Sequence, residues 1–121
     1  FEKHEGRLKY DIFMEMCPGL KCELDTYWAS NFGANDVPAI VAKYASRTPL
    51  LHVKDGLFDR EKPQKPLGAG RMDLPAVIHA ADERVLQWLV VELDNCDKDM
   101  LEAVSDSYAY LTRKGLGRGA R

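Results

Sequence analysis

The sequence LKCELDTYWASNFGANDVPAIVAKYASRTPLLHVK, residues 20–54, decides the fold. Its two ends, residues 20–25 and 49–53, are short apolar segments typical of strands. Between them, from position 37 to about 46, apolar residues recur at i, i+3, i+4 and i+7 and share one helix face: Val37, Ile40, Val41 and Tyr44. Asp36 precedes this segment as a helix cap, so the stretch predicts a strand, a helix and a second strand that together form one βαβ unit.

The rest of the chain continues this alternation. The first nine residues are typical of the end of a strand followed by a polar turn. We expect helices at residues 10–16, 74–81 and 98–114 and a further strand at residues 86–92. Asp73 and Asp97 are the expected caps of the last two helices, and residues 55–72 form a long, charged loop. Apolar strands separated by amphipathic helices predict an α/β fold, a parallel sheet covered by helices.

The composition is that of one folded domain. The chain has 121 residues, of which 45% are hydrophobic and 30% charged, and its apolar runs are far too short to span a membrane. The net charge is −2, and four of the 17 Lys and Arg residues lie in the last nine positions, so the acidic body argues against a nucleic-acid partner. Three cysteines without a CxxC pair argue against a disulfide framework and a Cys-rich zinc site.

The two ends of the chain bear on its location and extent. No basic-plus-apolar signal segment opens the sequence, so we expect a cytoplasmic location and no membrane partner. The first residue is Phe1 and not Met, so we expect the chain to begin inside a larger coding sequence. Residues 116–121 are expected to form a flexible basic tail.

Each predicted strand of the sheet ends in a polar residue. Asp25 closes the first, His52 lies at the end of the second, and Glu92 closes the third. Ligands of parallel α/β folds bind at the carboxyl ends of strands. Two carboxylates and an imidazole suit a divalent cation such as Mn²⁺, Mg²⁺, Co²⁺, Fe²⁺ or Zn²⁺, which can polarise a carbonyl and ease removal of the neighbouring proton. The alternative left open is that these carboxylates only cap the helices that come after the strands.

Other residues near these strand ends have two interpretations each. Trp28 can stack on a sugar ring or anchor a loop, and Lys54 can be a substrate-binding cation or a solvated charge at the end of a strand. The turn at residues 68–70 can bind phosphate through its backbone amides, although a plain turn is favoured because it follows a loop and not a strand. His79 is expected to be an exposed helical residue.

Four segments of the chain carry a family resemblance. They are ELDTYWA (23–29), PLLHVKD (49–55), LGAGRMDLPAVIHAA (67–81) and VVELDN (90–95). In this order and spacing they resemble the second half of a sugar phosphate isomerase/epimerase. These enzymes belong to the xylose isomerase-like TIM-barrel superfamily, which also contains inosose dehydratases and endonuclease IV.

The resemblance implies a half TIM barrel over residues 1–115 with a divalent metal at its C-terminal mouth. In the family, a Glu, an Asp, a His and a final Glu hold the metal, and Asp25, His52 and Glu92 match the last three. The first Glu is expected on a strand before Phe1. In the epimerase branch the first and last glutamates also form the acid/base pair, so Glu92 is the expected catalytic residue.

The resemblance further implies substrate contacts at Trp28 and Lys54. It also implies that Asp55 supports the metal ligands without binding the metal itself. Trp28 is also a departure, because endonuclease IV and the ketose 3-epimerases carry a His at that position. This difference disfavours both branches and leaves the inosose-type or other isomerase branches closer.

The expected function is that of a metal-dependent sugar or sugar phosphate isomerase/epimerase that abstracts a proton next to a carbonyl. A barrel of this type takes about 250 residues, and 121 residues are roughly half of one. The half-barrel is therefore either a fragment or is completed by self-association, for example as a homodimer. The alternative functions are a catalytically silent, self-associating half-barrel and an inosose dehydratase-like lyase.

Overall fold

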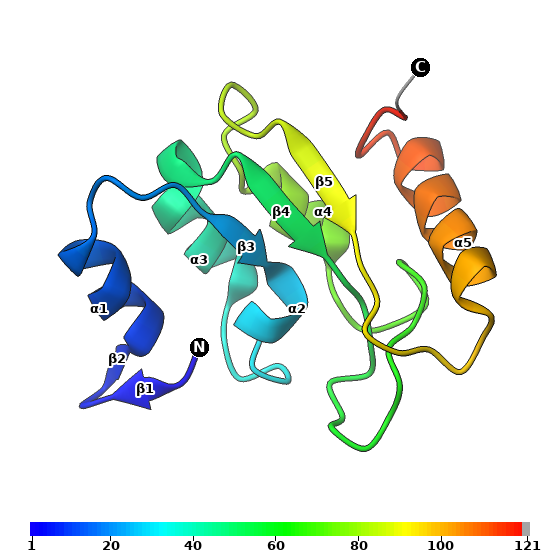
Figure 1. Cartoon of the computed structure of the whole chain (residues 1–121), viewed down its shortest axis with the longest axis horizontal. Coiled ribbons are helices and arrows are strands. Elements are labelled where there is room, and N and C mark those ends of the chain that lie inside the picture. The colour runs from blue at the N-terminus through cyan, green and yellow to red at the C-terminus, as the bar shows by residue number, and fades with distance from the viewer. Residues whose placement is uncertain (120–121) are drawn as a thin grey trace.

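A three-stranded parallel sheet forms the centre of the computed structural model, which describes residues 1–119. Its order is β3 (Glu23–Asp25), β4 (Leu50–Val53) and β5 (Trp88–Val91), and all three arrows point the same way in Figure 1. The register sets Asp25 opposite His52, and His52 opposite Val90. The predicted α/β class with parallel strands alternating with helices is confirmed.

The helices lie close to their expected positions. Before the sheet, an antiparallel pair, β1 (Lys3–His4) and β2 (Arg7–Leu8), leads into α1 (Lys9–Met16). The others are α2 (Thr26–Ala29), α3 (Val37–Tyr44) with the 3-10 turn η1 (Ala45–Arg47), α4 (Leu74–His79) and α5 (Met100–Arg113). The short helix α2 was not predicted, because four residues are too few to show a helical period.

Aspartates cap four of these helices. The carboxylates of Asp25, Asp36 and Asp73 each accept a hydrogen bond from the backbone N–H three residues ahead, at 2.9, 3.0 and 3.1 Å. Asp99 caps α5 by accepting the amides of Leu101 and Glu102, so the prediction that Asp97 caps this helix was wrong. Asp97 instead pairs with Lys65 of the long loop, which leaves Asp99 to satisfy the free amides at the start of the helix.

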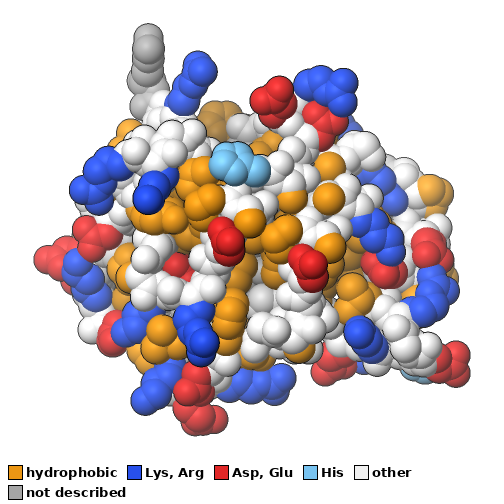
Figure 2. Space-filling view, turned by 180° about the vertical axis from the view of Figure 1, so that it is seen from behind, with side chains coloured by type: hydrophobic (Ala, Val, Ile, Leu, Met, Phe, Trp, Pro, Cys, Tyr) orange, Lys and Arg blue, Asp and Glu red, His pale blue; other side chains and the backbone are white. Residues whose placement is uncertain are grey.

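Within residues 1–119, helices cover only one face of the sheet. Leu24, Leu51 and Val53 point to that face and are buried, whereas their neighbours on the opposite face are more open, with Trp88 61% exposed. α3 and α4 lie behind the sheet in Figure 1. From that side, Figure 2 shows hydrophobic side chains in the middle of the face and charges of both signs around them. The expected cover of helices over the parallel sheet is therefore found on one of its two faces within residues 1–119.

The C-terminal helix α5 packs beside β5. Within it, the Ser107 hydroxyl accepts a hydrogen bond from the Leu67 amide at 3.0 Å, which ties the long loop to the helix. Of the predicted tail, Leu116 packs against the core and donates its amide hydrogen bond to the Leu111 carbonyl, while residues 120–121 lie outside the described residues.

No helix within residues 1–119 has both the length and the apolar character needed to cross a membrane. Of the cysteines, all free, only Cys22 is buried.

Two groups of polar contacts, one made by Arg47 and one by Asp11, fix α1 to the rest of the fold. The Arg47 guanidinium donates to the carbonyls of Met14, Cys17 and Leu20, which satisfies the end of the helix. On the other side, the Asp11 carboxylate accepts from the Tyr44 hydroxyl at 2.5 Å and pairs with the Lys43 ammonium at 2.8 Å. Partial burial raises the pKa of Asp11, but the hydrogen bonds from Lys43 and Tyr44 outweigh it and hold that pKa below its usual range.

The lowered pKa of Asp11 makes the stability of the fold depend on pH. Asp11 contributes fully to the free energy of unfolding above its unfolded-state pKa of about 3.9, and this contribution is lost as the pH falls through its folded-state pKa. We expect Asp11→Asn to lower the free energy of unfolding by about 1 kcal/mol at pH 7, with the difference from wild type shrinking towards pH 2. Urea unfolding from pH 2 to 7 measures it, with the exposed Glu61→Gln as control. A difference that does not change with pH would contradict the account.

Candidate metal centre

Three side chains converge at the carboxyl ends of the strands. Asp25 ends β3, His52 lies opposite it on β4, and Glu92 directly follows β5, where its amide bonds to the Val53 carbonyl. One ligand atom from each of Asp25, His52 and Glu92 lies within 4.8 Å of the others. The structure thus brings together the three residues that the sequence singles out.

The Asp25 carboxylate has two roles, one for each oxygen. Its Oδ1 accepts the Trp28 amide at 2.9 Å and caps α2. Its Oδ2 lies 3.9 Å from His52 Nδ1 and 3.0 Å from Lys54 Nζ. The two interpretations of this strand-end carboxylate are therefore compatible, because capping uses one oxygen and leaves the other free to face the cluster.

The His52 ring is held between carboxylates on its two edges. Its Nδ1 lies 2.8 Å from Glu92 Oε2, and its Nε2 lies 2.8 Å from Glu23 Oε1. Glu23 was not predicted, although its spacing of two residues from Asp25 puts both on the same face of β3. A histidine that binds a metal through one nitrogen commonly donates the other N–H to a carboxylate, and Glu23 is placed to accept it.

Lys54 lies at the middle of the acidic cluster. Its side chain is 3% exposed, and its Nζ lies 3.0 Å from Asp25, 3.2 Å from Glu92 and 3.1 Å from Asp94. Burial lowers the pKa of Lys54, but the three surrounding carboxylates outweigh it and hold that pKa above its usual range. The interpretation of Lys54 as a solvated charge was wrong, and its contact with a substrate stays a prediction.

Asp94 is held in place by Gln64, a buried residue of the long loop. The Gln64 amide group donates to Asp94 Oδ2 at 2.9 Å, and its carbonyl accepts the Asp94 backbone N–H at 2.7 Å. Sequence reasoning missed both residues. Asp94 follows Glu92 by two positions, a spacing that could have indicated it, whereas nothing in the sequence around Gln64 indicates its role.

Asp55 organises the long loop that follows β4. Fully buried, its carboxylate accepts the amides of Gly56 and Met72 on one oxygen and of Gly68 and Gly70 on the other, at 2.8 to 3.0 Å. A Cβ at Gly70 would lie 2.1 Å from Asp55 Oδ1, so glycine is required there. The amides of the turn at residues 68–70 thus bind an internal carboxylate, which argues against the phosphate interpretation of this turn.

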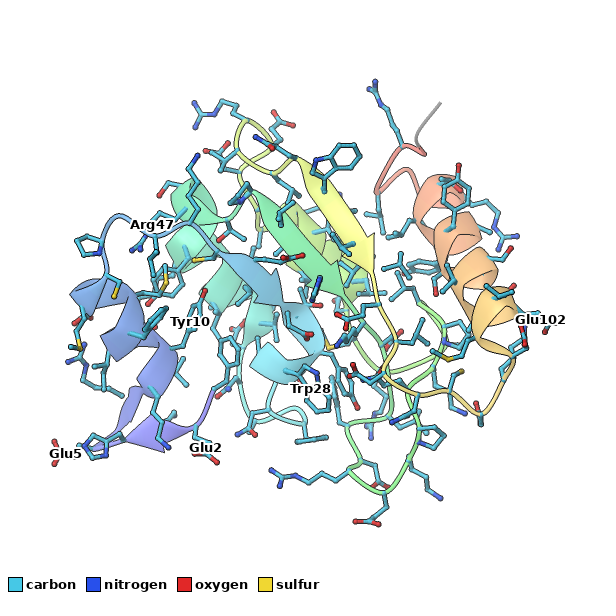
Figure 3. The ribbon with its side chains drawn as sticks, viewed as in Figure 1. Glu2, Glu5, Tyr10, Trp28, Arg47 and Glu102 are labelled. Atoms are coloured by element: carbon cyan, nitrogen blue, oxygen red, sulfur yellow. The ribbon has the colours of Figure 1, made fainter. Side chains whose placement is uncertain are left out.

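Trp28 belongs to the short helix α2, which follows the end of β3 (Figure 3). The residue is 42% exposed, and its ring contacts Tyr27 and Phe32 edge-on and has Lys54 Nζ 5.7 Å from its centre. The ring therefore anchors the local aromatic cluster and still leaves part of its surface accessible. Its contact with a sugar stays a prediction.

The chemistry of this donor set fits a divalent ion. Two carboxylate oxygens and one imidazole nitrogen are ligands accepted by Mn²⁺, Co²⁺, Fe²⁺ and Zn²⁺ and, through the carboxylates, by Mg²⁺. Two ligands that each lie about 2.2 Å from such an ion are at most about 4.4 Å apart, and His52 Nδ1 lies 2.8 Å from Glu92 Oε2 and 3.9 Å from Asp25 Oδ2. The ring orientation of His52 and the position of Glu23 agree with the same set.

Comparison with known proteins bears on the fold. The chain is similar to the crystal structure of a sugar phosphate isomerase/epimerase from Parabacteroides distasonis ATCC 8503, with a TM-score of 0.72 and 28% sequence identity. The match covers 97% of this chain. The chain thus has the fold of a partial xylose isomerase-like barrel.

The partial barrel spans 40% of the length of that solved structure. No protein-family model matches the sequence. A search of curated proteins also gives no match. The resemblance inferred from the sequence is confirmed at the level of the fold, and activity, substrate and metal are matters for proposal.

The buried carboxylate of Asp55 gives a test of how the partial barrel holds its loop. Asp55→Asn would replace one oxygen by an NH₂ group and leave two buried amides facing a donor. We expect a loss of about 3 kcal/mol or more in the free energy of unfolding. Urea unfolding measures it, with Asp59→Asn as the matched control, since exposed Asp59 accepts only a local amide in the same loop. Equal stability of the two variants would show that Asp55 does not hold the loop.

Proposed function

We propose that this chain carries part of the active site of a divalent-metal-dependent isomerase or epimerase that acts on a sugar or sugar phosphate. The observation that carries the proposal is the convergence of Asp25, His52 and Glu92 donor atoms within 4.8 Å. The similar solved protein is described as a sugar phosphate isomerase/epimerase, which supports the choice of substrate class. The proposal assigns residues 1–115 to the half-barrel.

Three atoms of the chain would hold the ion: Asp25 Oδ2, His52 Nδ1 and Glu92 Oε2. The first two face each other across the β3–β4 register, and Glu92 Oε2 already lies 2.8 Å from His52 Nδ1. When bound there, an ion such as Mn²⁺, Mg²⁺, Co²⁺, Fe²⁺ or Zn²⁺ would act as a Lewis acid towards the substrate carbonyl and its neighbouring hydroxyl.

Glu92 is the proposed catalytic base. Its carboxylate is 39% exposed, so it is accessible from the open face of the sheet, and it takes the proton from the carbon next to the carbonyl. In an isomerase, this proton is returned to the former carbonyl carbon. A second proton moves from the hydroxyl oxygen to the carbonyl oxygen, so that the carbonyl and the hydroxyl exchange places. In the alternative dehydratase reaction, the same proton removal is followed by loss of a hydroxyl group.

Trp28 and Lys54 are the proposed substrate contacts. The exposed part of the Trp28 ring offers an apolar surface to the C–H face of a sugar, and Lys54 Nζ offers hydrogen bonds to a substrate oxygen. Asp55 contributes indirectly, because it directly follows Lys54 and fixes the start of the long loop.

The second candidate is a catalytically silent half-barrel that associates with another copy. The observation that favours it is the open face of the sheet, where Trp88 is 61% exposed, together with β5, which has no neighbouring strand on its outer edge among residues 1–119. Exposed edges and apolar faces promote pairing between chains. A homodimer and an active enzyme are compatible, so metal binding decides between the two candidates.

Titration of Mn²⁺ into the purified chain tests the proposal. We expect binding at one site, and we expect His52→Ala to weaken it by a factor on the order of 100 or more because one of the three protein ligands is lost. The matched control is His79→Ala, an exposed histidine on α4, for which the affinity should equal that of wild type.

Two results would contradict the proposal. One is the absence of Mn²⁺, Co²⁺ and Zn²⁺ binding by the wild-type chain. The other is equal loss of affinity in the His52 and His79 variants, which would place the ion elsewhere. Product analysis with sugars and sugar phosphates then separates an isomerase from a lyase.

A further inference from the structure

Lys54 contacts the same carboxylate oxygens that would bind the ion. Its Nζ lies 3.0 Å from Asp25 Oδ2 and 3.2 Å from Glu92 Oε2, the two atoms assigned above as ligands. The side chain is 3% exposed, so water does little to screen these contacts. In the metal-free chain, the ammonium therefore provides the positive charge that the two ligands would otherwise receive from an ion.

The third partner of Lys54 is placed differently. Asp94 Oδ2 lies 3.1 Å from Nζ, but Asp94 is not part of the three-residue ligand set. Gln64 donates a hydrogen bond to the Asp94 carboxylate at 2.9 Å and accepts one from the Asp94 backbone N–H at 2.7 Å, which together fix Asp94. Asp94 thus remains available to Lys54 when Asp25 and Glu92 turn to another cation.

From this geometry we propose that Lys54 is a resident counter-ion that competes with the divalent metal for Asp25 and Glu92, and that Asp94 holds its ammonium when the metal is bound. The inference rests on the proposed metal site and adds what sets its affinity. The Lys54 ammonium stabilises the metal-free cluster, so a metal ion must displace this ammonium from two carboxylates. The affinity of the site for the ion is therefore lower than it would be for the same three ligands without Lys54.

The charge-removing variant Lys54→Met tests the inference directly. Without the competing cation, we expect Mn²⁺ to bind on the order of tenfold more tightly than to wild type. The metal-free variant should also unfold at lower urea concentration, because three carboxylates then lack their common cation. The matched control Lys62→Met removes the same charge from an exposed position of the long loop and should leave the affinity unchanged.

A double-mutant cycle tests the part assigned to Asp94. Asp94→Asn removes the alternative partner of Lys54, so it should weaken Mn²⁺ binding in the wild-type background. In the Lys54→Met background, where no ammonium needs a second partner, the same change should have an effect at least threefold smaller. If Asp94 acted only through its charge on the metal, the two effects would be equal.

The outcomes separate this inference from the metal site itself. Binding by wild type with equal or weaker binding by Lys54→Met overturns the counter-ion role and leaves the metal site standing. Absence of binding by both overturns both. Binding by Lys54→Met alone, or more tightly than by wild type, supports the inference. Lys54→Gln, which keeps hydrogen bonding without the charge, replaces Lys54→Met if circular dichroism shows that the Met variant is unfolded.

Discussion

The parallel register between β3 and β4 is the constraint on which the candidate site depends. It sets Leu24 beside Leu51 on the buried face and Asp25 beside His52 on the open face. Because side chains alternate along a strand, a slip of one residue would turn His52 towards the helices and Leu51 towards water. The burial of the two leucines therefore also fixes the position of the donor atoms, so the site is positioned by the core beneath it.

Polar side chains at the strand ends connect the sheet to the helix and the loop that come next in the chain. Asp25 caps α2 with one oxygen and faces the cluster with the other. Asp55, one residue after Lys54, gathers the amides of the long loop around a buried carboxylate. That loop in turn brings Gln64 against Asp94 and so fixes the last partner of Lys54. Local capping and the arrangement of the site thus rely on the same few carboxylates.

Much of this could be predicted from the sequence, for a physical reason. The helices follow from their apolar period and Asp caps, and Asp25, His52 and Glu92 follow from the rule that parallel strands end at one edge of a sheet. Contacts over long sequence distances could not be predicted. Lys65 pairs with Asp97, so Asp99 is the residue that caps α5. Gln64 contacts Asp94 from the long loop that the Asp55 carboxylate holds in place. The burial of Lys54 likewise depends on carboxylates from two distant segments, Asp25 at the end of β3 and Glu92 and Asp94 after β5.

The central claim is that one ion is held by the three strand-end residues. Anomalous diffraction at the manganese absorption edge, from crystals of the chain grown with Mn²⁺, tests it most directly. The account predicts one strong peak at about 2.0–2.3 Å from Asp25 Oδ2, His52 Nδ1 and Glu92 Oε2, with Lys54 Nζ drawn towards Asp94. A map without a peak at the ends of β3, β4 and β5, or with its strongest peak elsewhere on the chain, would contradict it.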